Sequence, residues 1–444
     1  MTAIDHRPLT RLAALAGVLA LAAGCGGVGG SDASPGGGAV SLTMMGFATG
    51  DEIAKTRFDL ATKAIAPGTA KAAEGAFNAQ QFLSAVASGT APDLVYMDRQ
   101  LIGTYAAKGA IVPLDSCIKD EKIDMGQYRK AAVAEVTLAG KVYGLPEFYD
   151  NRLLMATEQT QVRTEDWTAL AATTASLTRK GADGKLARIG FDPKIPEFLP
   201  MWAKANGADL VAADGRTAQL DDPKVVEALT YTTDLVKAQG GWSAFKSFRD
   251  SFDFFGAKNE FASDQLGAFP MEDWYINSLA QNSPQVKLVV TPFLGRDGKP
   301  VDWVTGNAWA IPAKAPHAAE ACRWIKTATA TDSWIAAAKA RAEARQKDGK
   351  PFVGVFTGNE KADETIFRDI VKPTGNAAFD NAVKVVLQTQ DSAFAAPALA
   401  AGEEFKAAWT GAVNRVLNGQ QQPTEALAQA QKEAQSALDK ANTK

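Results

Sequence analysis

Polar side chains follow a short apolar run early in the chain. Residues 94–97 (LVYM) are apolar, and Asp98, Arg99 and Gln100 come directly after them. A run this short and this apolar is typical of a parallel strand that is covered on both faces. Ligands bind α/β sheets in the crevice beyond the carboxyl ends of such strands. We therefore predict a binding position here; the alternative is that Asp98 only caps the helix that follows.

A second polar cluster follows another short apolar run. Residues 266–269 (LGAF) are expected to form a buried strand, and Glu272, Asp273 and Trp274 come shortly after it. Carboxylates provide charge-assisted hydrogen bonds, and an indole ring provides a flat apolar surface. Because Trp274 follows a strand end and lies among carboxylates, we favour ligand contact over core packing for this ring.

The composition excludes several classes of site. The chain has 444 residues, 22% of them charged, a net charge of −3 and only two histidines, His6 and His317. His6 lies in the segment that we expect to be a targeting signal, which leaves His317. A zinc site needs several such ligands and a Ser-His-Asp triad needs a well-placed imidazole, so both are nearly excluded. Acidic and basic residues are interspersed, which does not suit a nucleic-acid surface. We expect no metal, no cofactor and no nucleic-acid partner. From the length of the chain we expect two or three domains.

The first forty residues have the pattern of an export signal. Two arginines precede the apolar run 12–23, which is too short to cross a bilayer comfortably. The run ends beside Cys25 in a sequence (LAAGC) that resembles the lipobox of bacterial lipoproteins, and a glycine-rich stretch follows. We predict a signal peptide over 1–24 and a lipid-anchored flexible tether over 25–39. The alternative is an ordinary secretory signal with an incidental cysteine.

Two cysteines remain if Cys25 is lipidated. In an oxidising compartment Cys117 and Cys322 are free to pair. Cys322 also shares a helical face with Ala318 and Ile325, which is equally compatible with a buried free thiol. Both alternatives stay open at this stage.

Strand-like and helix-like segments alternate along most of the chain. Alternation of this kind predicts an α/β fold with parallel sheets. Two such halves are followed by a largely helical region that begins at Pro316. Two lobes joined by several crossings form a hinged cleft. The helices that we expect in the second half include 164–177, 197–206, 221–239 and 254–261.

Six segments of the chain resemble the family 1 extracellular solute-binding proteins of bacterial ABC importers. They are 87–93 (ASGTAPD), 105–114 (YAAKGAIVPL), 143–146 (YGLP), 266–274, 306–312 and 418–430 (NGQQQPTEALAQA).

This resemblance implies a two-lobed, periplasmic-binding-protein-like α/β fold of class II with a multi-strand hinge and a helical C-terminal part. Lobe 1 would comprise 40–150 plus 306–340, and lobe 2 would comprise 151–305 plus 341–444.

The resemblance also implies a set of ligand-binding residues. They would come from the strand ends, the crossings between lobes and one second-lobe helix. The implied set is Asp98, Arg99, Asp150, Asn151, Arg152, Glu197, Phe198, Trp202, Glu272, Asp273, Trp274, Thr305, Gly306 and Asn307.

Alternatives are kept for some of these residues. Arg152 would serve equally well as a structural ion pair across the hinge, and Asp150 beside it shares that ambiguity. Met97 stands where the family has an aromatic ring. All nine tryptophans lie from Trp167 onward, so most of the stacking surface should come from lobe 2. Trp309, like Trp324 and Trp334, is assigned away from the ligand.

The function that the resemblance implies is non-enzymatic capture of a carbohydrate by hinge closure. The ligand would be delivered to an ABC permease by a monomeric protein anchored through Cys25 to the outer face of the cell membrane. Aromatic rings suit the apolar faces of a sugar, and charged groups suit its hydroxyls. Because Arg99 and Arg152 are both cationic, a glycerophosphodiester or another polyol phosphate is an alternative ligand. A secreted glycoside hydrolase, with Asp98 and Glu272 as acid and base, is the rival class.

Overall fold

The computed structural model describes residues 39–73, 75–157 and 161–443, which form one compact unit. The predicted signal peptide, Cys25 and nearly all of the predicted tether lie outside the described residues. Within the described part, no helix combines the length and apolar character needed to span a membrane. The same part of the chain contains no group of three or more His, Cys, Asp and Glu side chains that could hold a metal ion.

The first lobe is built on a five-stranded sheet in the order β2-β1-β3-β13-β6. Strand β1 lies parallel to β2 and β3, whereas β13 runs antiparallel to β3 and β6. The predicted strand after residue 93 is confirmed as β3, which ends at Asp98. The strands are β1 Ser41–Met45, β2 Thr69–Ala72, β3 Leu94–Asp98, β6 Leu145–Pro146 and β13 Asn307–Ala310.

The second lobe is built on another five-stranded sheet in the order β11-β7-β10-β9-β8. Strands β9 and β10 are parallel, and β7 runs antiparallel to both β10 and β11. The prediction of parallel sheets is therefore wrong for β7 and β13, because the chain enters each of these strands from the other lobe. The strands are β7 Arg152–Thr157, β8 Arg179–Lys180, β9 Leu186–Phe191, β10 Leu266–Glu272 and β11 Leu288–Thr291.

The chain crosses between the lobes in segments that pair with one another. Residues 147–151 lead from β6 to β7, and residues 304–306 lead from β12 (Asp302–Trp303) to β13. Single bridges join Asp150 to Thr305 and Phe148 to Thr357. Strand β12 also pairs with β14 (Ala393–Phe394). These pairings form the predicted multi-strand connection between the lobes.

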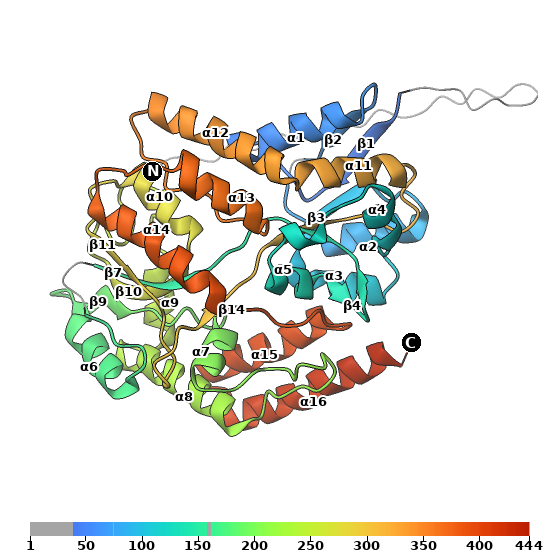
Figure 1. Ribbon diagram of the computed structural model, residues 1–444. Coiled ribbons are helices and arrows are strands. Elements are labelled where there is room, and N and C mark those ends of the chain that lie inside the picture. Colours follow the sequence, from blue (N-terminus) through green and yellow to red (C-terminus); the bar gives the residue numbers. More distant parts are fainter. Residues whose placement is uncertain (1–38, 74, 158–160, 444) are drawn as a thin grey trace, which may run out of the picture. The chain divides into compact units, whose positions relative to one another are not determined.

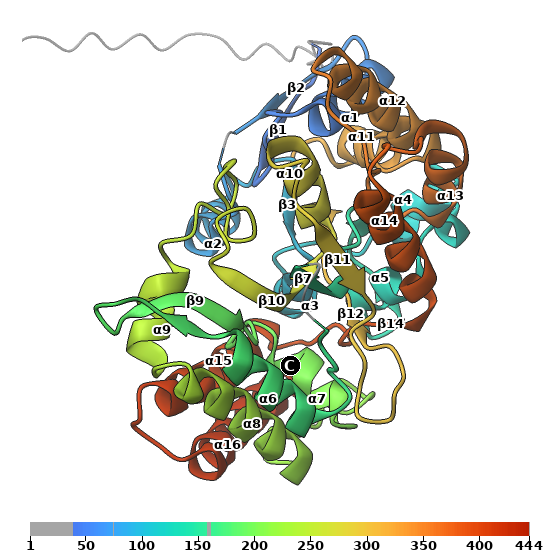
Figure 2. The ribbon, with the colours of Figure 1, turned by 90° about the vertical axis from the view of Figure 1, so that its left-hand side faces the viewer.

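Helices cover both sheets. Helices α11 and α12 pack on α1, and α15 packs along α16 and also reaches α3 (Figure 1). Helix α14 packs on β11, as seen in Figure 2. The first-lobe helices are α1 Glu52–Ala64, α2 Ala79–Ser88, α3 Arg99–Ala107, α4 Asp115–Asp120, α5 Lys130–Glu135 and α11 Ala318–Ala328, and the hairpin β4 Thr137–Leu138 with β5 Lys141–Val142 lies beside them. The others are α6 Trp167–Leu177, α7 Leu199–Ala205, α8 Pro223–Ala238, α9 Trp242–Arg249, α10 Trp274–Asn282, α12 Thr331–Lys347, α13 Glu360–Thr365, α14 Ala377–Thr389, α15 Gly402–Leu417 and α16 Pro423–Asn442.

The predicted lobe boundary between residues 340 and 341 requires correction. It falls inside α12, which continues to Lys347. Trp334, Ala337 and Ala338 of this helix share a buried cluster with Ile53 of α1. Beyond the predicted boundary, Arg341 pairs with Asp51 and Glu52 at the start of α1, so the helix packs as one piece on the first lobe.

One expected helix is absent from the described residues: 254–261 is a series of turns. The Asn259 side chain donates to the Gly256 carbonyl at 3.0 Å and accepts from the Ala262 amide at 3.1 Å. Such side-chain bonds compete with the helical hydrogen-bond pattern. The turns leave Phe255 66% exposed, which matters for the site described below.

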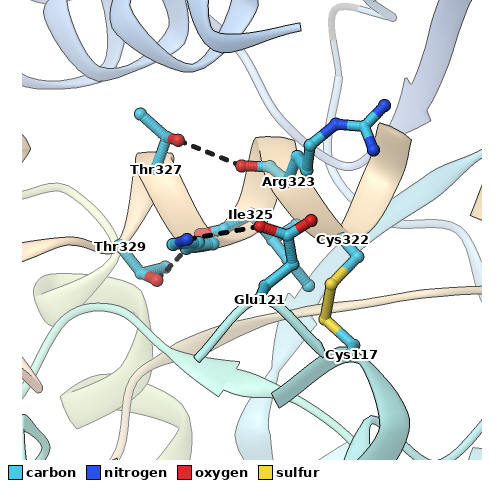
Figure 3. The surroundings of a disulfide bond; sticks show 8 residues. Cys117, Glu121, Cys322, Arg323, Ile325, Thr327 and Thr329 are labelled. Atoms are coloured by element: carbon cyan, nitrogen blue, oxygen red, sulfur yellow. Dashed lines mark hydrogen bonds and ion pairs between the residues drawn. A yellow bond between two sulfur atoms is a disulfide. The ribbon is translucent and has the colours of Figure 1, made fainter. Parts of the chain in front are cut away.

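A disulfide joins Cys117 to Cys322, which resolves the alternatives left open by the sequence (Figure 3). Cys117 lies on α4 and Cys322 lies on α11, so the bond ties two surface helices of the first lobe together. The nearby pair Lys326–Glu121, at 3.2 Å, joins the same two helices.

Replacing both Cys117 and Cys322 by serine is expected to lower the free energy of unfolding by about 2–5 kcal/mol. The bond closes a loop of 205 residues, so the oxidised unfolded chain has far fewer conformations than the variant. Urea unfolding of both proteins measures the effect. A reducing agent should remove the difference, and equal stability under oxidising conditions would contradict the pairing.

Candidate functional site

A cavity of about 480 Å³ lies where elements of both lobes and the crossings meet. We call it the aromatic cavity. Its lining comes from the loop between β1 and α1, from α10 and the turns before β10, from α12, and from the crossing segments that contain Asp150 and Phe356. This volume is within the range of ligand pockets in proteins.

Two aromatic rings form a flat wall of this cavity. The rings of Phe255 and Trp274 are stacked, with centroids 5.9 Å apart and an interplanar angle of 21°. Trp274 opens α10 directly after β10, and its indole nitrogen donates to Glu272 at 3.0 Å. Beneath them, Phe254 stacks on the buried Tyr275 at 4.4 Å. The inner pair thus supports the outer pair, whose rings face the cavity.

Asp150 provides an unpaired carboxylate in the same cavity. Its backbone is fixed by the bridge to Thr305, but its side chain accepts no hydrogen bond from the described residues. Burial raises the pKa of the Asp150 carboxyl to about 7, and the nearby Glu272 carboxylate adds to the rise. A carboxylate held without a protein donor is suited to accept hydrogen bonds from a ligand.

Asp273 belongs to the cavity wall but is already engaged. Its carboxylate accepts from the amide and from the side chain of Asn151, at 3.1 and 2.5 Å. Asn151 is fully buried, so its role in the structure is to hold the turn between the crossing and α10. Burial and the neighbouring Asp150 raise the pKa of Asp273.

Two arginines of α12 complete the cavity, and the sequence pattern did not identify them. Arg341 is paired with Asp51 at 2.9 Å and with Glu52 at 3.2 Å. Arg345 lines the cavity without an ion pair to any described residue, and partial burial lowers its pKa. Arg345 is therefore a free donor beside Asp150 and the stacked rings. Asp51 also caps α1, because its side chain accepts from the Ala54 amide at 2.8 Å.

The structure resolves the two alternatives for Arg152. Its guanidinium lies 2.7 Å from Glu272 and donates to the Trp303 carbonyl at 2.6 Å and to the Thr305 hydroxyl at 3.1 Å. It is 4% exposed. Arg152 is thus an ion pair at the crossing, and neither it nor Glu272 lines the aromatic cavity.

The prediction of Arg99 as a ligand contact requires correction. Arg99 is fully buried, pairs with Glu135 at 2.7 Å, and donates to the carbonyls of Phe148 and Thr305. It joins two crossings to the first lobe, and each of its three side-chain nitrogens donates to a group of the protein. Asp98 caps α3, accepting from Gln100 at 3.0 Å, as the alternative for that residue stated.

The residues predicted on the second-lobe helix are dispersed. Trp202 is fully buried and donates to the Pro193 carbonyl at 2.8 Å, so its prediction as a contact is corrected to a core residue. Phe198 is 4% exposed and packs beneath Arg152. Glu197 is exposed and lines a separate, neighbouring cavity of about 320 Å³.

The predicted residues at the crossing from β12 to β13 also have structural roles. Thr305 and Gly306 are buried, and Asn307 pairs with Asp98 across β13 and β3. Gly306 has φ +149°, and an added Cβ would lie 2.2 Å from the Phe148 carbonyl oxygen. Only glycine fits this approach between the two crossings. None of the three residues lines the aromatic cavity.

The three tryptophans that were assigned away from the ligand lie in the core. Trp309, Trp324 and Trp334 are each fully buried. Trp309 donates from its indole nitrogen to the buried Glu147 at 2.8 Å. The aromatic cavity is lined by Trp274, which was expected there, and by Phe255, Phe148 and Phe356, which were overlooked.

Stability is expected to fall as pH rises from about 4 to about 7 and to level off above. Burial raises the folded-state pKa of Asp150, Asp302, Asp363 and Glu135 to about 7, whereas an unfolded carboxyl titrates near its usual value of about 4. The folded state binds more protons in this window, so raising the pH favours unfolding. Melting temperatures from pH 5 to 8 measure the effect. The variant Asp302→Asn should show a smaller fall, and an unchanged profile would contradict the assignment.

Solved structures of similar fold hold oligosaccharides. The protein CpMnBP1 with mannotriose bound is 25% identical, with a TM-score of 0.71, and the match covers 89% of this chain and 100% of that one. A substrate-binding protein from Listeria monocytogenes in complex with cycloalternan is 18% identical (TM-score 0.70; 91% and 99% covered). The maltose/maltodextrin-binding domain MalE from Bdellovibrio bacteriovorus, bound to maltotriose, is also 18% identical (TM-score 0.68; 91% and 100% covered).

A search of curated proteins found no match. The model of one protein family, described as bacterial extracellular solute-binding protein, matches residues 70–344, which is more than half of the chain. The two-lobed α/β fold and the ligand-sized cavity between elements of both lobes agree with that match. The chain belongs to the family of bacterial extracellular solute-binding proteins.

Proposed function

We propose that this protein captures a carbohydrate, a mono- or oligosaccharide, in the aromatic cavity. The observation that carries the proposal is the stacked pair Phe255–Trp274 beside the unpaired carboxylate of Asp150. A sugar offers apolar C–H faces to a flat ring and hydroxyls to charged acceptors and donors. Arg345 provides such a donor in the same cavity.

The relatives support this class of ligand. Proteins of the same fold hold mannotriose, cycloalternan and maltotriose. The family is one of solute-binding proteins, so the rival assignment to a glycoside hydrolase is set aside. The chain would deliver its ligand, after hinge closure, to the permease of an ABC importer. As an extracellular protein it would act as a monomer anchored to the cell membrane through a lipid on Cys25.

A polyol phosphate or glycerophosphodiester is the second candidate ligand. The observation in its favour is Arg345, which faces the aromatic cavity without an ion pair to the described residues. A guanidinium of this kind binds phosphate through paired hydrogen bonds. Against it, the cavity also contains Asp150, whose carboxylate repels a phosphate when it is ionised. The carbohydrate therefore fits the cavity better.

A thermal-shift screen tests the proposal. Mannobiose, mannotriose, maltotriose and glycerophosphocholine are compared, because a ligand that binds only the folded protein raises its melting temperature. At a concentration of 100 times Kd the stabilisation is about 2.7 kcal/mol. We expect at least one oligosaccharide to raise the melting temperature and to remain unhydrolysed after incubation. A shift with glycerophosphocholine alone would favour the second candidate, and release of products would reinstate the hydrolase.

A further inference from the structure

A second cavity, of about 360 Å³, shares no lining residue with the aromatic cavity. We call it the Glu135 cavity. Its first-lobe wall includes Gln100 of α3 and Glu135 at the end of α5, and its second-lobe wall comes from α7, α15 and residues 394–399. Its aromatic side chains are Trp303, Phe394, Phe405 and Trp409.

Glu135 is an unusual lining residue for a cavity with so many apolar side chains. The residue is 2% exposed, and its Oε2 accepts from Arg99 at 2.7 Å. Its other oxygen, Oε1, is buried and has no hydrogen-bond partner among the described residues. A buried carboxylate oxygen without a donor costs free energy that a suitable ligand would recover. Arg99 holds the carboxylate in place, because its other two side-chain nitrogens donate to the carbonyls of Phe148 and Thr305.

The other charged groups of the lining already have partners. Lys204 lies 2.9 Å from Asp209, and Lys406 lies 3.9 Å from Asp98 and donates to Gln100 at 3.2 Å. The lining therefore lacks a hydrogen-bond donor for Oε1 of Glu135.

We propose that the Glu135 cavity binds an organic amine with an apolar body, whose ammonium group donates to Oε1 of Glu135. The volume is within the range of small-molecule pockets, and aromatic walls attract cations as well as apolar groups. The site is independent of the carbohydrate site and does not rest on the proposed function.

The probe is 2-phenylethylamine, and the matched control compound is 2-phenylethanol, which keeps the ring and lacks the charge. Isothermal titration calorimetry without sugar should show saturable one-to-one binding of the amine at millimolar concentrations. The alcohol should bind at least about tenfold more weakly, because its hydroxyl can still donate to Oε1 but lacks the positive charge that strengthens a hydrogen bond to a carboxylate. Absence of saturable amine binding, or equal affinity for the alcohol, would overturn the proposal.

Three variants locate the bound amine. Ala398→Trp fills the Glu135 cavity and should abolish binding, and Glu135→Gln should weaken it by about tenfold or more. Leu387→Trp, on an exposed position outside both cavities, should leave it unchanged. If Glu135→Gln does not fold, Ala398→Trp decides alone. Undiminished binding to Ala398→Trp, or loss of binding in Trp274→Ala, would place the amine elsewhere and refute the site.

Discussion

Replacing Trp274 by alanine is expected to lower carbohydrate affinity by about ten- to a hundredfold, or about 1.4–2.8 kcal/mol. The indole stacks on Phe255 at the cavity wall, so its removal takes away both a flat apolar surface and the support for the second ring. The melting temperature of the ligand-free protein should change little, because the ring is only partly buried. Calorimetry with the best sugar from the screen, and thermal melting without it, measure the two effects.

The matched control for this experiment is Trp242→Ala. Trp242 is another partly buried tryptophan, on α9, and it does not line the aromatic cavity. Its removal should leave the sugar affinity unchanged. If Trp274→Ala instead lowered the stability of the ligand-free protein strongly while affinity stayed intact, Trp274 would be a core residue and the proposed site would be wrong.

Replacing Arg99 by methionine is expected to lower the free energy of unfolding by about 3–5 kcal/mol. The change leaves the buried Glu135 carboxylate without its cation and removes the donors to the carbonyls of Phe148 and Thr305. Arg99→Lys should rescue little, because an ammonium cannot reproduce the geometry of the guanidinium. Urea unfolding measures the loss.

Arg163→Met provides the comparison for Arg99→Met. Arg163 is paired with Glu165 on the surface, where its side chain is 63% exposed, so its removal should change stability by less than about 1 kcal/mol. An Arg99→Met protein of normal stability that has lost sugar affinity would restore Arg99 to the ligand-binding set and contradict its structural role.

The sequence was informative where local pattern determines the outcome. The apolar run before Asp98 and the run before Glu272 both form buried strands, β3 and β10, as predicted. Both strands end later than expected, β3 at Asp98 instead of Met97 and β10 at Glu272 instead of Phe269. Trp274 nevertheless lies in the wall of the aromatic cavity. Periodicity likewise identified the helix that became α8, Pro223–Ala238.

Long-range partners explain the predictions that failed. Arg99 pairs with Glu135, 36 residues away, and donates to Thr305, 206 residues away. No local pattern reports that these groups consume its donors. Trp202 was placed on the wrong face because a seven-residue helix gives too few positions to define its buried side.

The failure to predict the other residues of the cavity also has a physical explanation. Phe255 looked like one position of an apolar helix, but Asn259 and its neighbours form turns that expose the ring. Arg341 and Arg345 reach the cavity only because α12 packs on α1, a contact between segments almost 300 residues apart. The available signal in the sequence was Gly256, directly after Phe254 and Phe255, because glycine favours a turn over a continuous helix.

The most direct test of the account is the structure of the protein crystallised with the oligosaccharide that stabilises it most. We predict one sugar ring on the face of the Phe255–Trp274 pair, with hydroxyls bonded to Asp150 and Arg345. A sugar bound outside this cavity, or one that leaves both rings and both charged groups uncontacted, would contradict the assignment of the site.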